Sequence, residues 1–203
     1  GVQDAATMYR AMLGAKQANA PIVAHIEDEG FNADGVMNAG PKADELGLPG
    51  MSNLTETAQL ARDLVLAQAS GVHYHACHVS TALSVDLIRD ARARGVNVTA
   101  EVSPHHLLLA DQDIPSDDAM YKMNPPLRSE ADRQALIKGL LDGTLDMIAT
   151  DHAPHTAAEK TGSMRSAAFG IVGSETAFAL LYTRFVMTNI FTLNQLIQWM
   201  STN

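Results

Sequence analysis

The chain has almost none of the cysteine that stabilises secreted proteins. Cys77 is the only cysteine in 203 residues, so no internal disulfide can form. One thiol beside eight histidines is typical of a reducing compartment, and we therefore expect a cytoplasmic protein. The sequence also lacks an apolar run long enough to span a bilayer and does not open on a signal peptide, so we expect no membrane partner.

Positive charge is scarce as well. The chain has 14 Lys and Arg residues against 23 Asp and Glu residues, which gives a formal net charge of -9. A surface of this sign repels nucleic acid and anionic lipid, and we expect neither as a partner. Aromatic residues make up only 5% of the chain, but the apolar fraction of 46% is sufficient for a substantial core.

The sequence does contain a regular alternation of short apolar segments and amphipathic segments. The apolar segments predict buried strands at 21–27, 72–79, 97–103 and 145–150. The amphipathic segments predict helices at about 4–19, 53–69, 81–94, 129–141 and 173–188, with a last helix from Thr192. Loops are expected at 28–52, 104–128 and 151–172. Strands that alternate with helices indicate βαβ units, so we expect an α/β fold with a parallel sheet.

A carboxylate and two imidazoles follow the last predicted strand. Residues 149–155 read Ala-Thr-Asp-His-Ala-Pro-His, so Asp151 lies just past the carboxyl end of that strand. In parallel α/β folds the catalytic groups gather at this end of the sheet. Asp151 is therefore placed to bind a metal or to move a proton. A plain cap of the next segment is the alternative for an isolated Asp.

Two earlier strands also carry a histidine near their carboxyl ends, namely His25 and His78. Strict alternation along the strand places His73, His75 and Cys77 on one face and His78 on the other. A structural core imidazole is the alternative for either His25 or His78 alone. Two imidazoles and a carboxylate at successive strand ends instead favour a site for Zn²⁺ or a similar ion, with open positions for water.

Five motifs occur in an order that resembles one family. They are His-Ile-Glu-Asp at 25–28, His-Val-Ser-Thr at 78–81, Thr-Ala-Glu-Val-Ser-Pro-His-His at 99–106, Lys-Met-Asn-Pro-Pro-Leu-Arg at 122–128 and the run at 149–155. Together they resemble the bacterial class I dihydroorotases of the amidohydrolase superfamily, over essentially the whole chain. The Asp-His-Ala-Pro-His run with Lys160 downstream is a specific signature of that family, although we assign Lys160 no chemistry. The Asn-Pro-Pro-Leu-Arg run is shared more widely with allantoinases.

The resemblance implies a TIM-type (β/α)8 metallo-dependent hydrolase barrel. Residues 1–203 would form one partial barrel domain, its second half, with about four parallel strands and their flanking helices. In the family a His-x-His pair ends the first strand, and a metal-bridging Asp precedes a run like Gly-Val-Gln-Asp at 1–4. No matching His-x-His is present, because His73 and His75 have the spacing but lie on a later strand. We therefore expect the N-terminal half of the barrel and the C-terminal remainder to lie outside this chain.

The resemblance also implies the metal and the roles of its ligands. Two Zn²⁺ ions occupy an intact site of this family. His25 and His78 would hold one ion with the bridging Asp, and Asp151 would hold the other with the His-x-His pair. Asp151 would also carry the proton from the attacking water to the leaving nitrogen. Because these three residues belong to two ions, we expect the metal site of this chain alone to be weak or empty.

Four further residues match substrate contacts of the family. The Asn124 amide, the His155 imidazole and the backbone of Phe169 and Gly170 would bind a small-molecule substrate through its amide, its carboxylate and its ring. Plain structural roles are the alternatives: a turn former ahead of two prolines for Asn124, an exposed loop residue for His155 and core packing for Phe169.

The activity implied by the resemblance is the reversible cyclisation of N-carbamoyl-L-aspartate to L-dihydroorotate in pyrimidine biosynthesis. We expect the chain by itself to be inactive. One alternative is another cyclic amidohydrolase, an allantoinase or a hydantoinase, because fold does not fix function. The other is a catalytically silent scaffold subunit, as some dihydroorotase-like proteins are for aspartate transcarbamoylase. A homodimer and an association with aspartate transcarbamoylase are the partners we expect.

Overall fold

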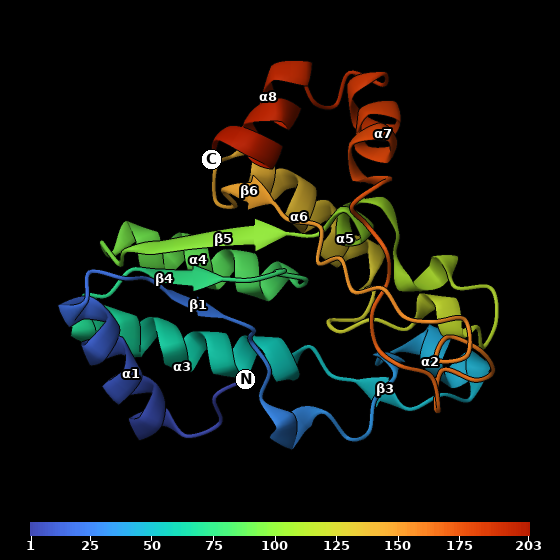
Figure 1. The fold of residues 1–203 in the computed structure, drawn as a ribbon, viewed down its shortest axis with the longest axis horizontal. Helices are drawn as coiled ribbons and strands as arrows, with labels where there is room; N and C mark the ends of the chain where they lie inside the picture. Colours follow the sequence, from blue (N-terminus) through green and yellow to red (C-terminus); the bar gives the residue numbers. More distant parts are fainter.

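The central feature of the fold is a four-stranded parallel sheet. A computed structural model describes residues 1–203, the whole chain. The strands are β1 (Ile22–Ala24), β4 (Tyr74–Ala76), β5 (Val98–Val102) and β6 (Met147–Ile148), and they lie in the order β1-β4-β5-β6 (Figure 1). All neighbouring pairs are parallel. Strand order follows chain order, as in a barrel built from successive β/α units, which confirms the predicted α/β fold.

Helices cover one face of this sheet. They are α1 (Ala5–Gln17), α3 (Leu54–Ser70), α4 (Ala82–Ala93) and α6 (Glu130–Leu141), and each packs against the next. The main core lies between these helices and the strands. Along β5 the residues Val98, Ala100 and Val102 are buried in this core, whereas Thr99 and Glu101 are half-buried on the opposite face. The sheet is thus apolar towards the helices and polar on its other face.

Local capping explains why the helices begin where they do. The side chains of Asp4, Thr81 and Ser129 each accept a hydrogen bond from the backbone N–H three residues on. Such a cap satisfies one of the N–H groups that a helix leaves without an intrahelical partner. Asn53 precedes α3, but its side chain makes no cap bond.

Two of the predicted loops are structured. Segment 28–52 contains a 3₁₀ turn (Glu29–Phe31), a short parallel pair of β2 (Met37–Asn38) and β3 (Gly50–Met51), and α2 (Pro41–Leu46). Segment 104–128 contains α5 (Pro104–Leu108) and 3₁₀ turns at Asp111–Asp113 and Ala119–Tyr121. Gly35 and Gly50 allow the backbones to approach, since a Cβ would lie 2.6 Å from Met51 N and 2.5 Å from Ala39 Cα respectively.

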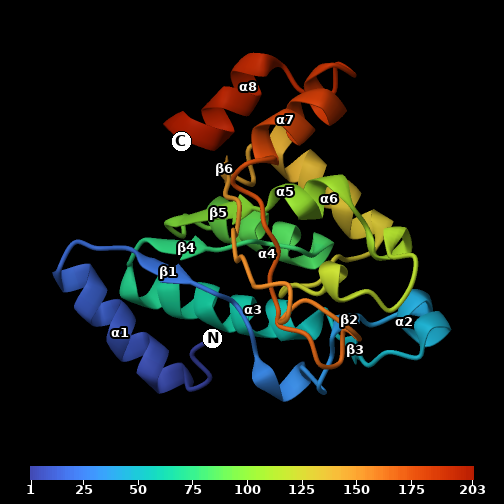
Figure 2. The ribbon, with the colours of Figure 1, turned by 45° about the vertical axis from the view of Figure 1, so that its right-hand side comes forward.

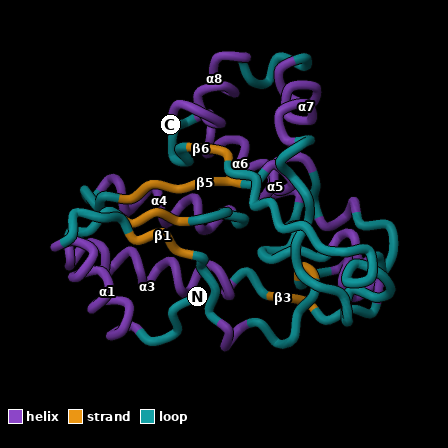
Figure 3. The backbone as a smooth tube through the Cα atoms, viewed as in Figure 1, coloured by secondary structure: helices purple, strands orange, loops and turns teal.

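These segments and the loop after β6 form a lobe with its own small core, to which Val36, Met37, Ile114, Met123 and Met164 contribute. The strand arrows point towards this loop-rich lobe (Figure 1), and Figure 3 shows how much irregular backbone it contains. The lobe therefore lies at the carboxyl end of the sheet, where the predicted functional residues follow their strands.

The C-terminal segment packs beyond β6. The predicted helix at 173–188 corresponds to α7 (Ala177–Leu181), which continues as a π-helical turn at Tyr182–Val186. The last helix is α8 (Leu193–Ile197), followed by a second π-helical turn at Gln198–Thr202. Figure 2 shows α7 and α8 together beyond β6, where Phe185, Phe191 and Trp199 form an aromatic cluster. No helix in the structure combines the length and the apolar character needed to cross a membrane.

Candidate active site

The two predicted histidines meet at the carboxyl end of the sheet. His25 follows β1 directly, and His78 lies two residues after β4. His25 Nδ1 and His78 Nε2 are 2.8 Å apart, and the two rings meet edge to face. The imidazole of His25 is half-buried, and that of His78 is buried. The structure thus brings together two side chains that are 53 residues apart in the sequence.

The backbone at two of the site residues is strained. His78 has a φ of 37° and Asp151 a φ of 49°, both in the left-handed region that non-glycine residues rarely adopt. Such conformations cost about 1 to 3 kcal/mol each and cluster at functional sites. The sequence placed His78 on the opposite face of the strand from His73 and His75. This prediction was wrong because the backbone of His78 is left-handed. Alternation applies only to extended backbone, and the left-handed turn of His78 brings its ring to His25 instead.

Asp151 acts electrostatically on the same group of side chains. Burial lowers the pKa of His78, the neighbouring His25 lowers it further, and the carboxylate of Asp151 acts in the opposite direction. Burial raises the pKa of Cys77 to about 11, and the carboxylates of Glu101 and Asp151 contribute to that rise. The lowered pKa keeps the His78 imidazole neutral at pH 7, the form in which a ring nitrogen can bind a metal.

A polar network that the sequence did not reveal lies on the same face of the sheet. His75 Nε2 lies 3.0 Å from Glu101 Oε2, and His75 Nδ1 lies 2.8 Å from Thr99 Oγ1. The other carboxylate oxygen of Glu101 accepts from the backbone N–H of His78. Burial raises the pKa of Glu101, but the hydrogen bond and charge of His75 outweigh this effect, and the pKa lies below its ordinary value.

This network contains a second set of potential ligands. One nitrogen of His75, the sulfur of Cys77 and one oxygen of Glu101 lie within 4.8 Å of one another. Glu101 occurs in the motif at 99–106, and its period-two spacing from Thr99 was the signal that could have indicated a role on this face.

A buried carboxylate fixes the backbone that follows His78. Glu56 of α3 is 2% exposed and accepts from the backbone N–H groups of Ser80 and Thr81 at 3.1 and 3.2 Å. Arg128, also 2% exposed, donates from Nε to Ser80 Oγ at 3.1 Å. This arrangement holds the turn between β4 and α4 from both sides. The sequence did not single out Glu56, because a lone Glu in a helix pattern gives no sign of burial.

The predicted substrate contacts lie on two sides of the site. Asn124 contributes to lowering the pKa of Glu27, and Glu27 Oε2 lies 3.0 Å from His25 Nε2. Asn124 therefore acts on the carboxylate that lies beside His25. Burial raises the pKa of Glu27, but His25 and Asn124 outweigh this effect, and the pKa is lowered overall.

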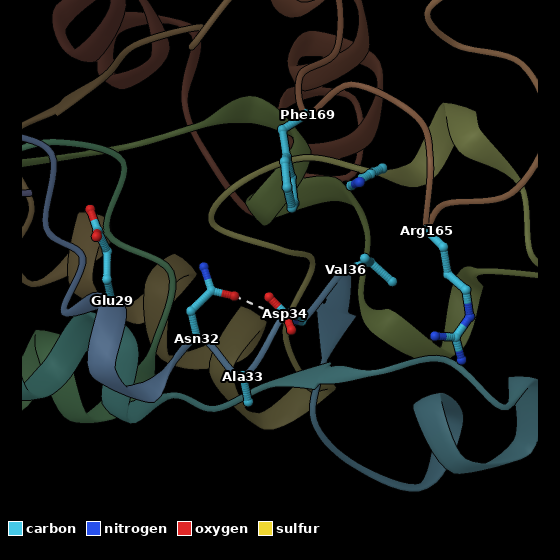
Figure 4. Close-up of a pocket in the computed structure, with 9 residues that line it drawn as sticks. Glu29, Asn32, Ala33, Asp34, Val36, Arg165 and Phe169 are labelled. Carbon is cyan, nitrogen blue, oxygen red and sulfur yellow. Dashed lines mark hydrogen bonds between the residues drawn. The ribbon is translucent and has the colours of Figure 1, made fainter.

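The other three predicted contacts adjoin one another in the lobe. His155 Nε2 lies 2.8 Å from the carbonyl oxygen of Phe169. Gly170 has a φ of 131°, and a Cβ there would lie 2.7 Å from Ala153 Cβ, so this position requires glycine. Phe169 points into a cavity of about 540 Å³ that is also lined by Asn32 and Arg165 (Figure 4). His155 and Gly170 line a neighbouring, more apolar cavity of about 700 Å³.

Comparison with known proteins identifies the family. The sequence model of the Amidohydrolase family matches residues 2–203. The chain belongs to the amidohydrolase family. Among curated relatives of this amidohydrolase, the dihydroorotase of Ligilactobacillus salivarius is 66% identical over 203 residues, which are 100% of this chain and 47% of the relative. The dihydroorotase of Enterococcus faecalis is 62% identical over 201 residues, 99% of this chain and 47% of the relative. The chain therefore spans about half the length of the curated relatives it matches.

Solved amidohydrolases share the fold. The L-hydantoinase of Arthrobacter aurescens superposes with a TM-score of 0.85 at 23% identity, over 96% of this chain and 45% of that one. A D-hydantoinase from a Bacillus sp. AR9 gives a TM-score of 0.83 at 25% identity, again over 96% and 45%. These likenesses confirm that the four-stranded sheet is part of a TIM-type amidohydrolase barrel.

The family implies a metal, and the donor set of this amidohydrolase fits one. The site offers two imidazoles in contact and the carboxylate of Asp151, which are ligand types that a divalent ion such as zinc accepts. His78 Nδ1 is buried without a hydrogen-bond partner, so the polar environment of this ring is incomplete within the chain.

Proposed function

We propose that this chain is part of a zinc-dependent dihydroorotase, which interconverts N-carbamoyl-L-aspartate and L-dihydroorotate. The observation that carries the proposal is the contact of His25 with His78 at the strand ends, where the backbone of His78 and of Asp151 is strained and the Asp151 carboxylate acts on the pKa of His78. The identity of 58 to 66% to curated dihydroorotases supports this substrate over others.

In this proposal the chain supplies metal ligands and a proton carrier. His25 and His78 would hold one zinc ion, and Asp151 would contact the other. Zinc, when bound, makes water a stronger acid and polarises the amide carbonyl. Asp151 takes the proton from the attacking water and gives it to the leaving nitrogen when the ring opens. In the cyclisation direction it returns the proton along the same path. Catalysis of this kind typically contributes about 10² to 10⁴-fold.

The remaining predicted residues would orient the substrate. The Asn124 amide, which acts on the pKa of the carboxylate bonded to His25, would contact a substrate amide near the metal. His155 would grip a substrate carboxylate with the nitrogen that now faces Phe169 O, and the backbone of Phe169 and Gly170 would contact the ring. The cavities that these residues line would admit a small polar molecule.

A substrate comparison on the full-length, zinc-loaded protein tests the proposal. We expect turnover of dihydroorotate and little or none of hydantoin or allantoin. Hydantoinase activity is the second candidate, because the similar solved structures include hydantoinases. Clear turnover of hydantoin without turnover of dihydroorotate would show that the protein is a hydantoinase and would contradict the dihydroorotase proposal. Activity on none of the three, with zinc bound, would favour a silent scaffold.

We also propose a homodimer in the cytoplasm, with aspartate transcarbamoylase as a further partner. Support comes from the resemblance of the five motifs and, for the location, from the single cysteine. Light scattering on the full-length protein, with and without added aspartate transcarbamoylase, tests both associations. A monomer whose mass does not change on mixing would contradict them.

A further inference from the structure

Lys160, the residue of the signature run without an assigned role, makes an unusual pair of contacts. Its Nζ donates to the carbonyl oxygen of Lys122 at 2.9 Å and to that of Ala168 at 3.0 Å. It forms no ion pair with a carboxylate anywhere in the chain. The ammonium therefore ties two backbone segments that are 46 residues apart, rather than neutralising a charge.

Lys122 also donates from its ammonium group to a backbone carbonyl oxygen, in the same segment that Lys160 contacts. It is 4% exposed, its Nζ donates to Ala167 O at 2.7 Å, and its ammonium lies 4.2 Å from the ring centroid of Phe169. Its own carbonyl accepts from Gly170 N as well as from Lys160. Lys122, like Lys160, forms no ion pair with a carboxylate in residues 1–203.

Together the contacts hold four consecutive residues. The carbonyls of Ala167 and Ala168 accept from the two lysines, Phe169 O lies beside His155 Nε2, and Gly170 N donates to Lys122 O. Segment 167–170 has no helix or strand to fix it, so these bonds, together with those from Ala167 N to Ser163 O and from Ala168 N to Glu159 O, define its position. The same segment carries Phe169 and Gly170 and touches His155.

Placing two like-charged ammonium groups together and burying them is unfavourable, and core packing does not require it. Burial lowers the pKa of both lysines, and the charge of Lys122 lowers that of Lys160 further. An apolar side chain of equal length would fill the same space without placing two like charges together. What an ammonium adds is a charge-assisted hydrogen bond, which is shorter and stronger than a neutral one and fixes the direction of the carbonyl that accepts it.

We propose that Lys160 and Lys122 form a backbone clamp that positions Phe169, Gly170 and His155 for substrate. The lysines touch no reacting atom in this role, so they are positioning residues. The inference rests on the proposed function for the identity of the substrate. The clamp itself rests on the contacts above.

The test compares Lys160→Met with Lys160→Arg in the full-length, zinc-loaded protein. Met keeps the length and loses the donors, whereas Arg keeps a charged donor. Lys138→Met is the matched control, since Lys138 is exposed on α6 and its Nζ makes no hydrogen bond. We expect Lys160→Met to raise KM for dihydroorotate about tenfold, the equivalent of one charged hydrogen bond, and to lower kcat by less than about threefold. Lys160→Arg should return KM to within about threefold of wild type.

Hydrogen exchange supplies a readout that does not depend on the substrate. The amides in 166–171 should exchange faster in Lys160→Met and not in Lys138→Met, with little change elsewhere. If Lys160→Met does not fold, Lys160→Gln replaces it, because the shorter amide loses the reach to Ala168 O. Unchanged exchange at 166–171, or a KM equal to that of the control, would overturn the clamp. A wild type without dihydroorotate activity would refute the proposed function, and the exchange comparison would still decide the clamp.

Discussion

At the scale of single residues, the site is marked by backbone strain. His78 and Asp151 follow parallel strands, and both have left-handed φ values. The sequence predicted their proximity, because carboxyl ends of parallel strands converge. It could not predict the direction of the His78 side chain. Period-two alternation is a property of extended backbone, and nothing in the run His-Val-Ser-Thr reveals where the extension stops.

Asp151→Asn should nearly abolish turnover of dihydroorotate by the full-length protein while leaving the fold intact. The amide has the same size but cannot accept the proton. We expect less than about a tenth of the wild-type kcat, given the usual size of acid–base effects. Asp90→Asn, at an exposed position of α4, is the control. A variant at Asp151 that keeps more activity than this would show that another group carries the proton.

Buried histidines should make the protein less stable in mild acid. Burial lowers the pKa of His106 to about 4, whereas a histidine in the unfolded chain titrates near 6.5. The unfolded state therefore binds the proton first as the pH falls below 6.5, and stability is lost until about pH 4. This residue alone should remove about 2 kcal/mol between pH 7 and pH 5.

Urea unfolding of His106→Gln at both pH values measures this contribution. We expect the variant to lose less stability than wild type over this interval, whatever its stability at pH 7. Equal losses in the two proteins would show that His106 is not protonated on unfolding in this range.

At the scale of elements, prediction succeeded where the chain repeats a pattern. The helices at 5–17, 82–93 and 130–141 match the predicted ones closely, since each combines an amphipathic face with a side-chain cap. The lobe was missed. Strands of two residues show no periodicity, and the pairing of β2 with β3 depends on the close backbone approach at Gly35 and Gly50.

The turn between β4 and α4 should depend on Glu56. Its carboxylate accepts from two backbone N–H groups and lies near buried Arg128, whose pKa it raises against the larger effect of burial. Glu56→Gln should lower the free energy of unfolding by at least about 2 kcal/mol, since buried donors lose an acceptor. It should also weaken zinc binding, because His78 precedes this turn.

Urea unfolding and zinc titration of the full-length protein check both effects. Glu45→Gln is the control, because Glu45 makes only a surface ion pair with Lys42, and such pairs contribute about 1 kcal/mol or less. If Glu56→Gln were no less stable than Glu45→Gln, the carboxylate would not hold the turn.

At the scale of the whole molecule, the chain presents one helix-covered sheet with two outer strands. Strand β1 and strand β6 each pair on one side only, and Val23 of β1 is 62% exposed. The order of the four strands was predictable because each β/α unit is local in sequence. The polar face of the sheet was not predictable, because His75, Thr99 and Glu101 come into contact only when β4 and β5 pair in register.

Residues 1–203 expressed alone should bind zinc weakly and show no dihydroorotase activity. Only His25, His78 and Asp151 of the proposed ligand set are present, and by resemblance they serve two ions. The unpaired edges of β1 and β6 should also promote self-association. Zinc titration should give an affinity at least about 100-fold below that of the full-length protein. An equal affinity would mean that one ion takes all three residues.

The most direct measurement is anomalous diffraction at the zinc edge from crystals of the full-length, zinc-loaded protein. It distinguishes the His25–His78 pair and Asp151 from the alternative donors His75, Cys77 and Glu101. We predict zinc in contact with the imidazoles of His25 and His78, and a second zinc in contact with the carboxylate of Asp151. Zinc held only by His75, Cys77 and Glu101, with His25 and His78 still bonded to each other, would contradict the proposed site.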